Sequence, residues 1–376
     1  MFEDFHLGWF AVGAAFFGRA LIACAALERV PYLPRAIEGE PREVDAVVIA
    51  DEVDGVAECL ASLRAQTGVA LRVLLVDDRS PPEAAARLRT LAASHGVEMV
   101  RIDAVPAGSL PFAHAITQAL ARGDRDEVLL LARPIVARVD DALLRALVAL
   151  RTTRAAALWL IPRAHAGWLT PLAFSSLADA LPALAAAQRD RDAPALPIDA
   201  ALYRRAFLAD ALSQPGAESA PIVEFTLAQK ALRDGVRIRV AHAALEFGVA
   251  KRSGLRDFVE LSERTLASYG LRLWLAAAFA TLYLACWIAA VLGPFDPNPW
   301  GLFAAGGLAS TAVSGVLVAR VQRASLHGAL AAGLLVPFVG LIEASALAFV
   351  VARLSLRRGA RWRGVFVPLR ALSRRP

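Results

Sequence analysis

Residues 44–80 read VDAVVIADEVDGVAECLASLRAQTGVALRVLLVDDRS, in which apolar runs alternate with short polar breaks. The apolar run at 46–50 predicts a strand buried on both faces, and the run at 72–76 predicts a second one. Between them, Val56, Leu60 and Leu63 recur at helical spacing, which predicts a helix over 56–66. The stretch therefore predicts two parallel strands joined by a right-handed helical crossover, which is the building unit of an α/β sheet.

Acidic residues follow both predicted strands. Asp51 and Glu52 come directly after the first strand, and Asp77 and Asp78 close the second. Because open parallel sheets bind ligands beyond the carboxyl ends of their strands, we expect these four side chains at one site. A phospho-acceptor receiver domain places its acidic pair after the first strand, whereas the pair Asp77-Asp78 follows the second. A dinucleotide-binding fold needs G-x-G-x-x-G after the first strand, and ADEVDG does not match it.

These residues resemble the opening of family 2 glycosyltransferases of the GT-A fold. In that family the first strand ends near Asn-Glu and the second ends in V-D-D-x-S, where this chain has Asp51-Glu52 and VDDRS at 76–80. The resemblance implies a mainly parallel GT-A sheet domain that binds a nucleotide-sugar, with a UDP-sugar as the expected donor. It implies that Asp77 and Asp78 contact uracil and ribose, with Asp51 and Glu52 nearby.

The composition predicts a membrane protein that carries a soluble insert. Of 376 residues, 57% are hydrophobic, and the apolar residues are concentrated near the two ends. The net charge of +6 comes almost wholly from arginine, but the insert mixes acids with bases, which argues against nucleic-acid binding. The three cysteines are scattered and the histidines lack metal-ligand spacing, so no disulfide or metal framework is predicted.

We divide the chain into a membrane anchor and linker at 1–43, a GT-A-like domain at 44–266 and a C-terminal membrane region at 267–376. Apolar stretches at 7–27, 273–293 and 300–319 are long enough to span a bilayer. A fourth, at 328–352, contains Pro337, Gly340 and Glu343, and the tail after it carries eight arginines and no acid. The positive-inside rule therefore favours a re-entrant fourth segment broken near 337–343, with an ordinary span as the alternative. It also predicts an inner-membrane protein whose GT-A domain faces the cytoplasm.

Within the family, the chain is most similar to membrane glycosyltransferases associated with bacterial hopanoid biosynthesis. They share the anchor, the GT-A domain, the C-terminal membrane segments and a basic end with W-K/R-G, here Trp362-Arg363-Gly364. This resemblance implies a lipid-type acceptor. The lysine of the family's G-K-x-W-A-x-x-Q-G segment is replaced by Phe112.

The largest departure concerns the metal motif D-x-D of the family. Counting back from Asp141-Ala142-Leu143, its two acidic positions fall on Arg133 and Ile135. The family's Mg²⁺ or Mn²⁺ needs hard oxygen ligands, which neither residue supplies, so we predict no metal ligands. Arg133 has two interpretations, a phosphate contact that replaces the metal or a surface arginine after a strand.

Glu224 stands where the family carries its acceptor-side base, in IVEFTL at 222–227. The resemblance implies that it removes the proton of the acceptor hydroxyl. Alternatively, Glu224 is a helix-start acid that the helix dipole favours. Because several motifs are degenerate, a catalytically inactive relative that binds nucleotide, lipid or a partner enzyme is the main rival function. A small transporter is disfavoured because intramembrane ionisable residues are few.

Overall fold

The computed structural model describes residues 3–35, 42–106, 109–164, 177, 180, 199–214, 216–220, 222–249, 259, 262–263, 273–295, 299–357, 359–362 and 365–368. Two compact units divide the chain. The sheet unit comprises Val30–His165 and Ala183–Arg252, and the helical unit comprises Met1–Arg29, Ala166–Pro182 and Ser253–Pro376. The alanine-rich stretch 170–188, whose composition predicts a helix, falls almost wholly outside the described residues.

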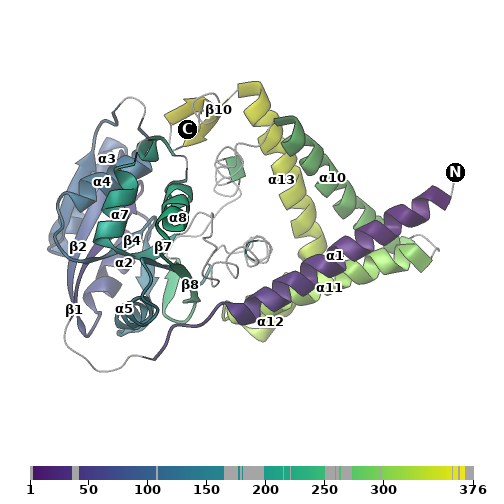
Figure 1. Ribbon diagram of the computed structural model, residues 1–376, viewed down its shortest axis with the longest axis horizontal. Helices are drawn as coiled ribbons and strands as arrows, with labels where there is room; N and C mark the ends of the chain where they lie inside the picture. Colours follow the sequence, from purple (N-terminus) through teal and green to yellow (C-terminus); the bar gives the residue numbers. More distant parts are fainter. Residues whose placement is uncertain are drawn as a thin grey trace. The chain divides into compact units, whose positions relative to one another are not determined.

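In the described part of the sheet unit, seven strands form one sheet in the order β3-β2-β1-β4-β7-β6-β8 (Figure 1). All neighbours are parallel except β7, which runs antiparallel to β4 and to β6. The predicted α/β class with a mainly parallel sheet is therefore confirmed. The strands are β1 (Arg42–Ala50), β2 (Val69–Asp78), β3 (Glu98–Ile102), β4 (Glu127–Leu131), β6 (Ala157–Ile161), β7 (Ala200–Arg204) and β8 (Ile238–His242).

Helices cover both faces of this sheet. Successive strand residues point to opposite faces, and Val44, Ala46, Val48 and Ala50 of β1 share a core with α2, α3 and α5. On the other side, α4 packs on β1 and contacts α7, which contacts α8. The helices are α2 (Val56–Arg64), α3 (Pro82–Ser94), α4 (Pro111–Leu120), α5 (Ala142–Thr152), α7 (Arg205–Leu212) and α8 (Val223–Asp234), with a short 3-10 turn, η2, at Ala217–Ser219.

The sequence offers Asp140 or Asp141 as the residue that caps the start of α5. Asp141 occupies the capping position, but its side chain makes no capping hydrogen bond. Its Oδ2 instead accepts a hydrogen bond from Nε of Arg145, one turn later, at 2.8 Å.

A second, two-stranded sheet follows β4 directly. β5 (Ile135–Ala137) pairs antiparallel with β9 (Phe247–Val249). Helix α2 holds β5 in place through Ser62, whose Oγ accepts from the N–H of Ala137 at 3.0 Å. Gln66 extends this anchor, because its Nε2 donates to the carbonyl of Val139 at 2.9 Å. The structure thus ties the helix after β1 to the segment after β4.

Cys59 lies between these two elements. Its side chain is wholly buried in the core that α2 forms with the sheet. Burial raises the pKa of the thiol to about 12, although a hydrogen bond from the backbone of Ile135 acts in the opposite direction. The thiol therefore stays protonated at neutral pH.

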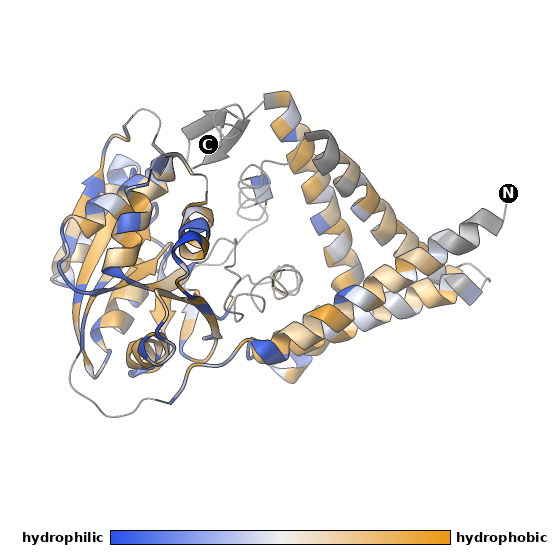
Figure 2. Ribbon diagram, viewed as in Figure 1, coloured by the Kyte–Doolittle hydropathy of each residue, from blue (hydrophilic) through white to orange (hydrophobic). Residues whose placement is uncertain are grey.

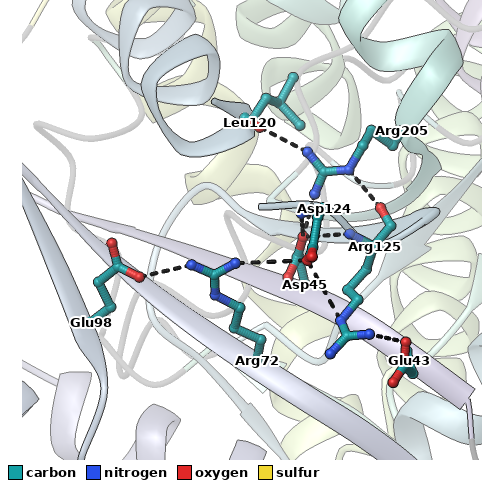
Figure 3. A network of polar contacts seen from close by, with 8 residues as sticks. All are labelled: Glu43, Asp45, Arg72, Glu98, Leu120, Asp124, Arg125 and Arg205. Atoms are coloured by element: carbon teal, nitrogen blue, oxygen red, sulfur yellow. Dashed lines mark hydrogen bonds and ion pairs between the residues drawn. The ribbon is translucent and has the colours of Figure 1, made fainter. Parts of the chain in front are cut away.

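Charged residues at the amino ends of β1 and β4 form a network of hydrogen bonds and ion pairs (Figure 3). Asp45 is buried, and its Oδ2 accepts from the backbone N–H groups of Asp124 and Arg125 at 3.1 Å and from Nη2 of Arg205. Arg205 also donates to the carbonyl of Leu120 at 2.9 Å. The network joins β1, the loop before β4 and helix α7, so it fixes the amino edge of the sheet.

The helical unit is dominated by apolar helices (Figure 2). Of the described residues, three helical stretches are long and apolar enough to cross a membrane, Gly8–Arg29, Gly301–Val321 and Phe338–Leu356. Ala280–Leu292 is a shorter apolar helical stretch. The elements are α1 (Glu3–Arg29), α10 (Leu273–Leu292), η3 (Gly293–Phe295), α11 (Pro299–Val321), α12 (Leu326–Leu334), α13 (Val336–Arg357) and the hairpin of β10 (Gly359–Trp362) and β11 (Val365–Pro368).

The break in the fourth apolar segment lies earlier than we expected. Helix α12 ends at Leu334 and α13 begins at Val336, so Pro337, Gly340 and Glu343 all lie inside α13. A proline in the first turn of a helix removes no intrahelical hydrogen bond, so Pro337 can begin α13 without interrupting it. The segment is therefore broken at Leu335, just before Pro337, and whether it re-enters or spans the bilayer stays a prediction.

Glycine lets α1 and α11 approach each other closely. A Cβ atom on Gly307 would lie 2.7 Å from the backbone oxygen of Gly13, and one on Gly13 would overlap the ring of Phe303. Small residues at such contacts are typical of helix pairs in membranes, where close backbone packing replaces hydrophobic burial.

Candidate functional site

The strand directions bring the chemically interesting residues to one edge of the sheet. Because β1, β2, β3, β4, β6 and β8 share one direction, their carboxyl ends meet at the edge where the antiparallel β7 begins. We call it the carboxyl edge. In the spatial order of the strands it carries Asp78, Asp51, Arg133, Asp199 and Arg163. The ends of β2 and β1 thus carry acids, whereas the positions that follow β4 and β6 are arginines.

At the carboxyl edge, the ends of β1 and β2 lie side by side. Ala50 pairs in register with Asp77, so the loop that starts at Asp51 leaves the sheet beside Asp78. Glu52 is exposed, whereas Asp78 is only 2% exposed and its Oδ1 accepts from Nε of Arg79 at 3.1 Å. The sheet therefore places side by side the ends of the two strands that carry these four acids.

Asp77 differs from Asp78 because both of its carboxylate oxygens accept hydrogen bonds from other residues of the protein. Oδ1 accepts from the backbone N–H of Ser80 at 2.9 Å, and Oδ2 accepts from Nη1 of Arg101 at 3.2 Å. The side chain is fully buried. Arg79, inside this turn, has a φ of 61°, which is unusual for a residue with a side chain. Asp77 thus shapes the turn that presents Asp78, a role that sequence analysis missed; direct ligand contact by Asp77 stays a prediction.

Arg133 follows β4 and is engaged by an acid from β7. Its Nε lies 2.9 Å from Oδ1 of Asp199, and the N–H of Ala132 donates to the backbone oxygen of Asp199 at 2.8 Å. Both side chains remain about one-third exposed. Sequence analysis missed Asp199 because it missed β7; the signal available was an acid directly before the run AALYR.

The residues at the end of β4 do not fit a divalent cation. Ile135 is wholly buried in β5, and Arg133 carries the wrong charge. Within the described ranges, no group of three or more His, Cys, Asp or Glu side chains is arranged to hold a metal. Because Mg²⁺ and Mn²⁺ prefer carboxylate and other hard oxygen ligands, this part of the site offers no metal cradle.

Glu224 belongs to helix α8, in the layer that contains α4 and α7. It lies in the first turn of α8 and is 6% exposed. The 3-10 turn before α8 is tied to the start of α4, since the N–H of Leu110 donates to the carbonyl of Glu218 at 2.5 Å. Helix α4 follows β3, so this contact sets the start of α8 on the side of the carboxyl edge. The negative charge of Glu224 adds to burial in raising the pKa of Tyr203 well above its ordinary value.

Phe112 fills the position where the resemblance led us to expect a lysine. It lies in the first turn of α4 and is buried. An apolar ring at this position contributes packing and no charge to the carboxyl edge.

Comparison with known proteins gives a fold. No family model matches the chain, and no curated protein sequence matches it. A mannosyltransferase from Pyrobaculum calidifontis, solved in complex with GDP-Man and Mn²⁺, matches 93% of this chain and 98% of its own at a TM-score of 0.54 and 16% identity. The chain has a GT-A fold.

Glucosyl-3-phosphoglycerate synthase from Mycobacterium tuberculosis is also similar. Its complex with Mn²⁺, uridine diphosphate and glucosyl-3-phosphoglycerate matches 60% of this chain and 78% of its own, at a TM-score of 0.41 and 17% identity. The GT-A fold agrees with the expectation that VDDRS and the preceding strand raised.

Proposed function

We propose that this protein is a membrane-bound glycosyltransferase of the family 2 type, which transfers a sugar from a nucleotide-sugar to a lipid-type acceptor. The observation that carries the proposal is the GT-A fold, shared over 93% of this chain with a mannosyltransferase whose structure holds GDP-Man. The four acids at the ends of β1 and β2 add to it, since carboxylates there can accept hydrogen bonds from ribose hydroxyls and a base N–H.

Each proposed residue has one task in the transfer. Asp78 binds the nucleoside of a UDP-sugar together with Asp51 and Glu52, while Asp77 holds the turn and stands next to the base. Glu224 takes the proton of the acceptor hydroxyl as that oxygen attacks the anomeric carbon. The bond between the sugar and the phosphate breaks, and its electrons leave with the nucleoside diphosphate. Arg133, at the end of β4, is the phosphate contact that sequence analysis proposed, although its Nε already pairs with Asp199.

The location and the acceptor follow from the helical unit and the charge pattern. We place the protein in the inner membrane as a multi-pass protein, with residues 44–266 as a cytoplasmic domain between an anchor at 1–43 and a membrane region at 267–376. The three apolar helices support membrane insertion, and the arginine-rich tail favours a cytoplasmic orientation of the C-terminus. The acceptor would then be a lipid hydroxyl at the cytoplasmic leaflet, with a hopanoid as the class that the sequence resemblance suggests.

Replacing Glu224 tests the proposal. We expect the full chain, purified in lipid nanodiscs with a panel of UDP- and GDP-sugars and lipid acceptors, to transfer sugar. Glu224→Gln should lower kcat by about 10²- to 10⁴-fold, the usual contribution of a general base, while UDP binding stays within twofold. The matched control is Glu83→Gln, an exposed acid in the first turn of α3, which should keep full activity. Undiminished transfer by Glu224→Gln would remove Glu224 from the mechanism.

A second candidate function is that of an inactive relative that binds nucleotide, lipid or a partner enzyme. The specific observation in its favour is the end of β4, where Arg133 and buried Ile135 stand at the positions of the metal-binding acids. UDP binding without transfer to any acceptor in the same assay would support this candidate over the enzyme.

A further inference from the structure

Two arginines approach each other across β9, on the β6 side of the carboxyl edge. Gly248, the middle residue of β9, pairs with β5 on one side and bridges to Arg163 on the other. The backbone N–H of Arg138 donates to the carbonyl of Glu246 at 2.7 Å, and that of Arg163 donates to the carbonyl of Phe247 at 2.8 Å. The backbones of both arginines are thus fixed on opposite sides of one short strand.

The side chain of Arg138 passes over the glycine, and that of Arg163 starts beside it. A Cβ atom on Gly248 would lie 3.4 Å from Cδ and 3.5 Å from Nη1 of Arg138, and 3.8 Å from Cβ of Arg163. Both side chains therefore start from the same face of β9, and only the absence of a side chain at position 248 leaves the space between them open.

The described residues do not neutralise this pair. Within them, neither guanidinium forms an ion pair or a side-chain hydrogen bond. The nearby acids Asp141 and Glu246 pair with Arg145. Its Nε lies 2.8 Å from Oδ2 of Asp141, and its Nη1 lies 3.5 Å from Oε1 of Glu246. Burial and the positive charge of Arg138 lower the pKa of Arg163. Two like charges at close range repel each other, and a bound anion would convert that repulsion into attraction.

We propose that Arg138 and Arg163 together bind a phosphate group of a substrate, a role that rests on the proposed function for the identity of that substrate. Guanidinium groups suit this ligand, because their paired N–H donors match two phosphate oxygens. The phosphate has two possible sources, the diphosphate of the donor and a phosphate on the lipid acceptor. The sheet order sets β6 three strand spacings from β1, roughly 14 Å, so a nucleotide anchored at β1 and β2 would have to extend along the edge.

Inorganic pyrophosphate is the first probe, titrated calorimetrically into the full chain in a neutral detergent at low salt. Arg138→Gln and Arg163→Gln should each weaken its binding by about ten- to hundredfold, which is the usual effect of losing a charged hydrogen bond. Arg163→Lys keeps the positive charge but loses the paired N–H donors of the guanidinium. Its affinity for pyrophosphate should lie between those of the wild type and Arg163→Gln. The control Arg89→Gln, on the exposed face of α3, should bind within twofold of the wild type. Absence of pyrophosphate binding in the wild type, or equal binding by all variants, would overturn the inference.

Three further ligands identify the source of the phosphate. If the donor supplies it, both variants weaken UDP binding by tenfold or more and leave uridine binding unchanged. If the acceptor supplies it, they weaken dodecyl phosphate binding and leave UDP unchanged. If the variants bind each of the three ligands as tightly as the wild type does, the phosphate site is refuted.

The transfer assay separates this site from the proposed function. Pyrophosphate binding through the two arginines without sugar transfer would refute the proposed function alone. Sugar transfer that Arg138→Gln and Arg163→Gln leave unchanged, together with unchanged phosphate binding, would refute the phosphate site alone.

Discussion

The two edges of the sheet treat their charged residues in opposite ways. At the amino edge, the carboxylate of Asp45 is enclosed by Arg205 and two backbone N–H groups, and the surrounding charges pair with one another (Figure 3). At the carboxyl edge, Glu52 is exposed, and no described residue pairs with the guanidinium groups of Arg138 and Arg163.

This difference separates charges that stabilise the fold from charges that are available to a ligand. A buried, fully paired ion pair is costly to break, because the remaining partner is left without compensation. Exposed or unpaired charges contribute little to stability and can interact with a ligand. Substitutions of the buried, paired charges should therefore act on the free energy of unfolding, and those of the exposed or unpaired charges at the carboxyl edge on ligand affinity.

The largest effect should follow removal of the amino-edge carboxylate. Asp45→Ala leaves Arg205, whose side chain is 18% exposed, without its acid, and should lower the free energy of unfolding by about 3–5 kcal/mol. Hydrogen exchange of the β1 and β4 amides in the full chain measures this loss. Asp199→Asn, which breaks a pair that is about one-third exposed at the other edge, should cost about 0–1 kcal/mol. Equal losses for the two variants would contradict the distinction between the edges.

A smaller loss should follow from crowding the same network. A methyl group on Gly123 would overlap the carboxylate of Asp45 and the guanidinium of Arg205, so Gly123→Ala should destabilise the sheet by about 1–3 kcal/mol. Gly248→Ala is the matched change at the carboxyl edge, where the added methyl meets Arg138 at an ordinary 3.4 Å. The same exchange measurement should show less than about 1 kcal/mol of loss for it.

Neighbouring acids on β2 should separate stability from affinity. Asp78→Asn should weaken UDP binding about tenfold, as expected for a lost charged hydrogen bond, with a small change in unfolding. Asp77→Asn should do the reverse, because it weakens the contact with Arg101 and the Ser80 turn, with an expected loss of about 1–3 kcal/mol. Calorimetry with UDP and thermal unfolding of both variants provide the test. A tenfold loss of affinity in both, at unchanged stability, would show that Asp77 also contacts the nucleotide.

The smallest expected effect is that of metal removal. Since the end of β4 offers Arg133 and Ile135 in place of carboxylates, EDTA should leave the rate of sugar transfer unchanged. Activity that EDTA abolishes and Mn²⁺ restores would show that acids elsewhere in the chain bind a cation.

The sequence predicts the strands that are continuous apolar runs between polar breaks, and it does not reveal β5, β7 and β9. The apolar run at 127–131 predicts a strand with the bounds that β4 has, because a continuous apolar run between polar breaks has few other interpretations. β7 was missed because its four apolar residues show no period of their own, and its partner β4 precedes it by about seventy residues. β5 and β9, of three residues each, are strands only because they pair with each other.

Some residues of the candidate site could be predicted from the sequence, and others could not. Asp51 and Asp78 follow predictable strands, so their proximity could be inferred. Arg138 and Arg163 could not be found, because arginine is common throughout this chain and only the pairing of β9 brings these two together. Asp77 was placed correctly, but its hydrogen bonds depend on Arg101 of the adjacent strand, which the sequence alone does not specify.

The rate at which the buried thiol of Cys59 is alkylated reports how often the core of the sheet unit opens. A protonated sulfur enclosed between α2 and β5 reacts with an alkylating reagent only while that part of the core is open. Cys24 and Cys286, the other two cysteines, are partly exposed in the helical unit and are the ones to block first. The rate of the slow modification of Cys59 that follows would then measure how often the layer that holds β5 opens. It would also measure how long the surface that includes Arg138 stays intact.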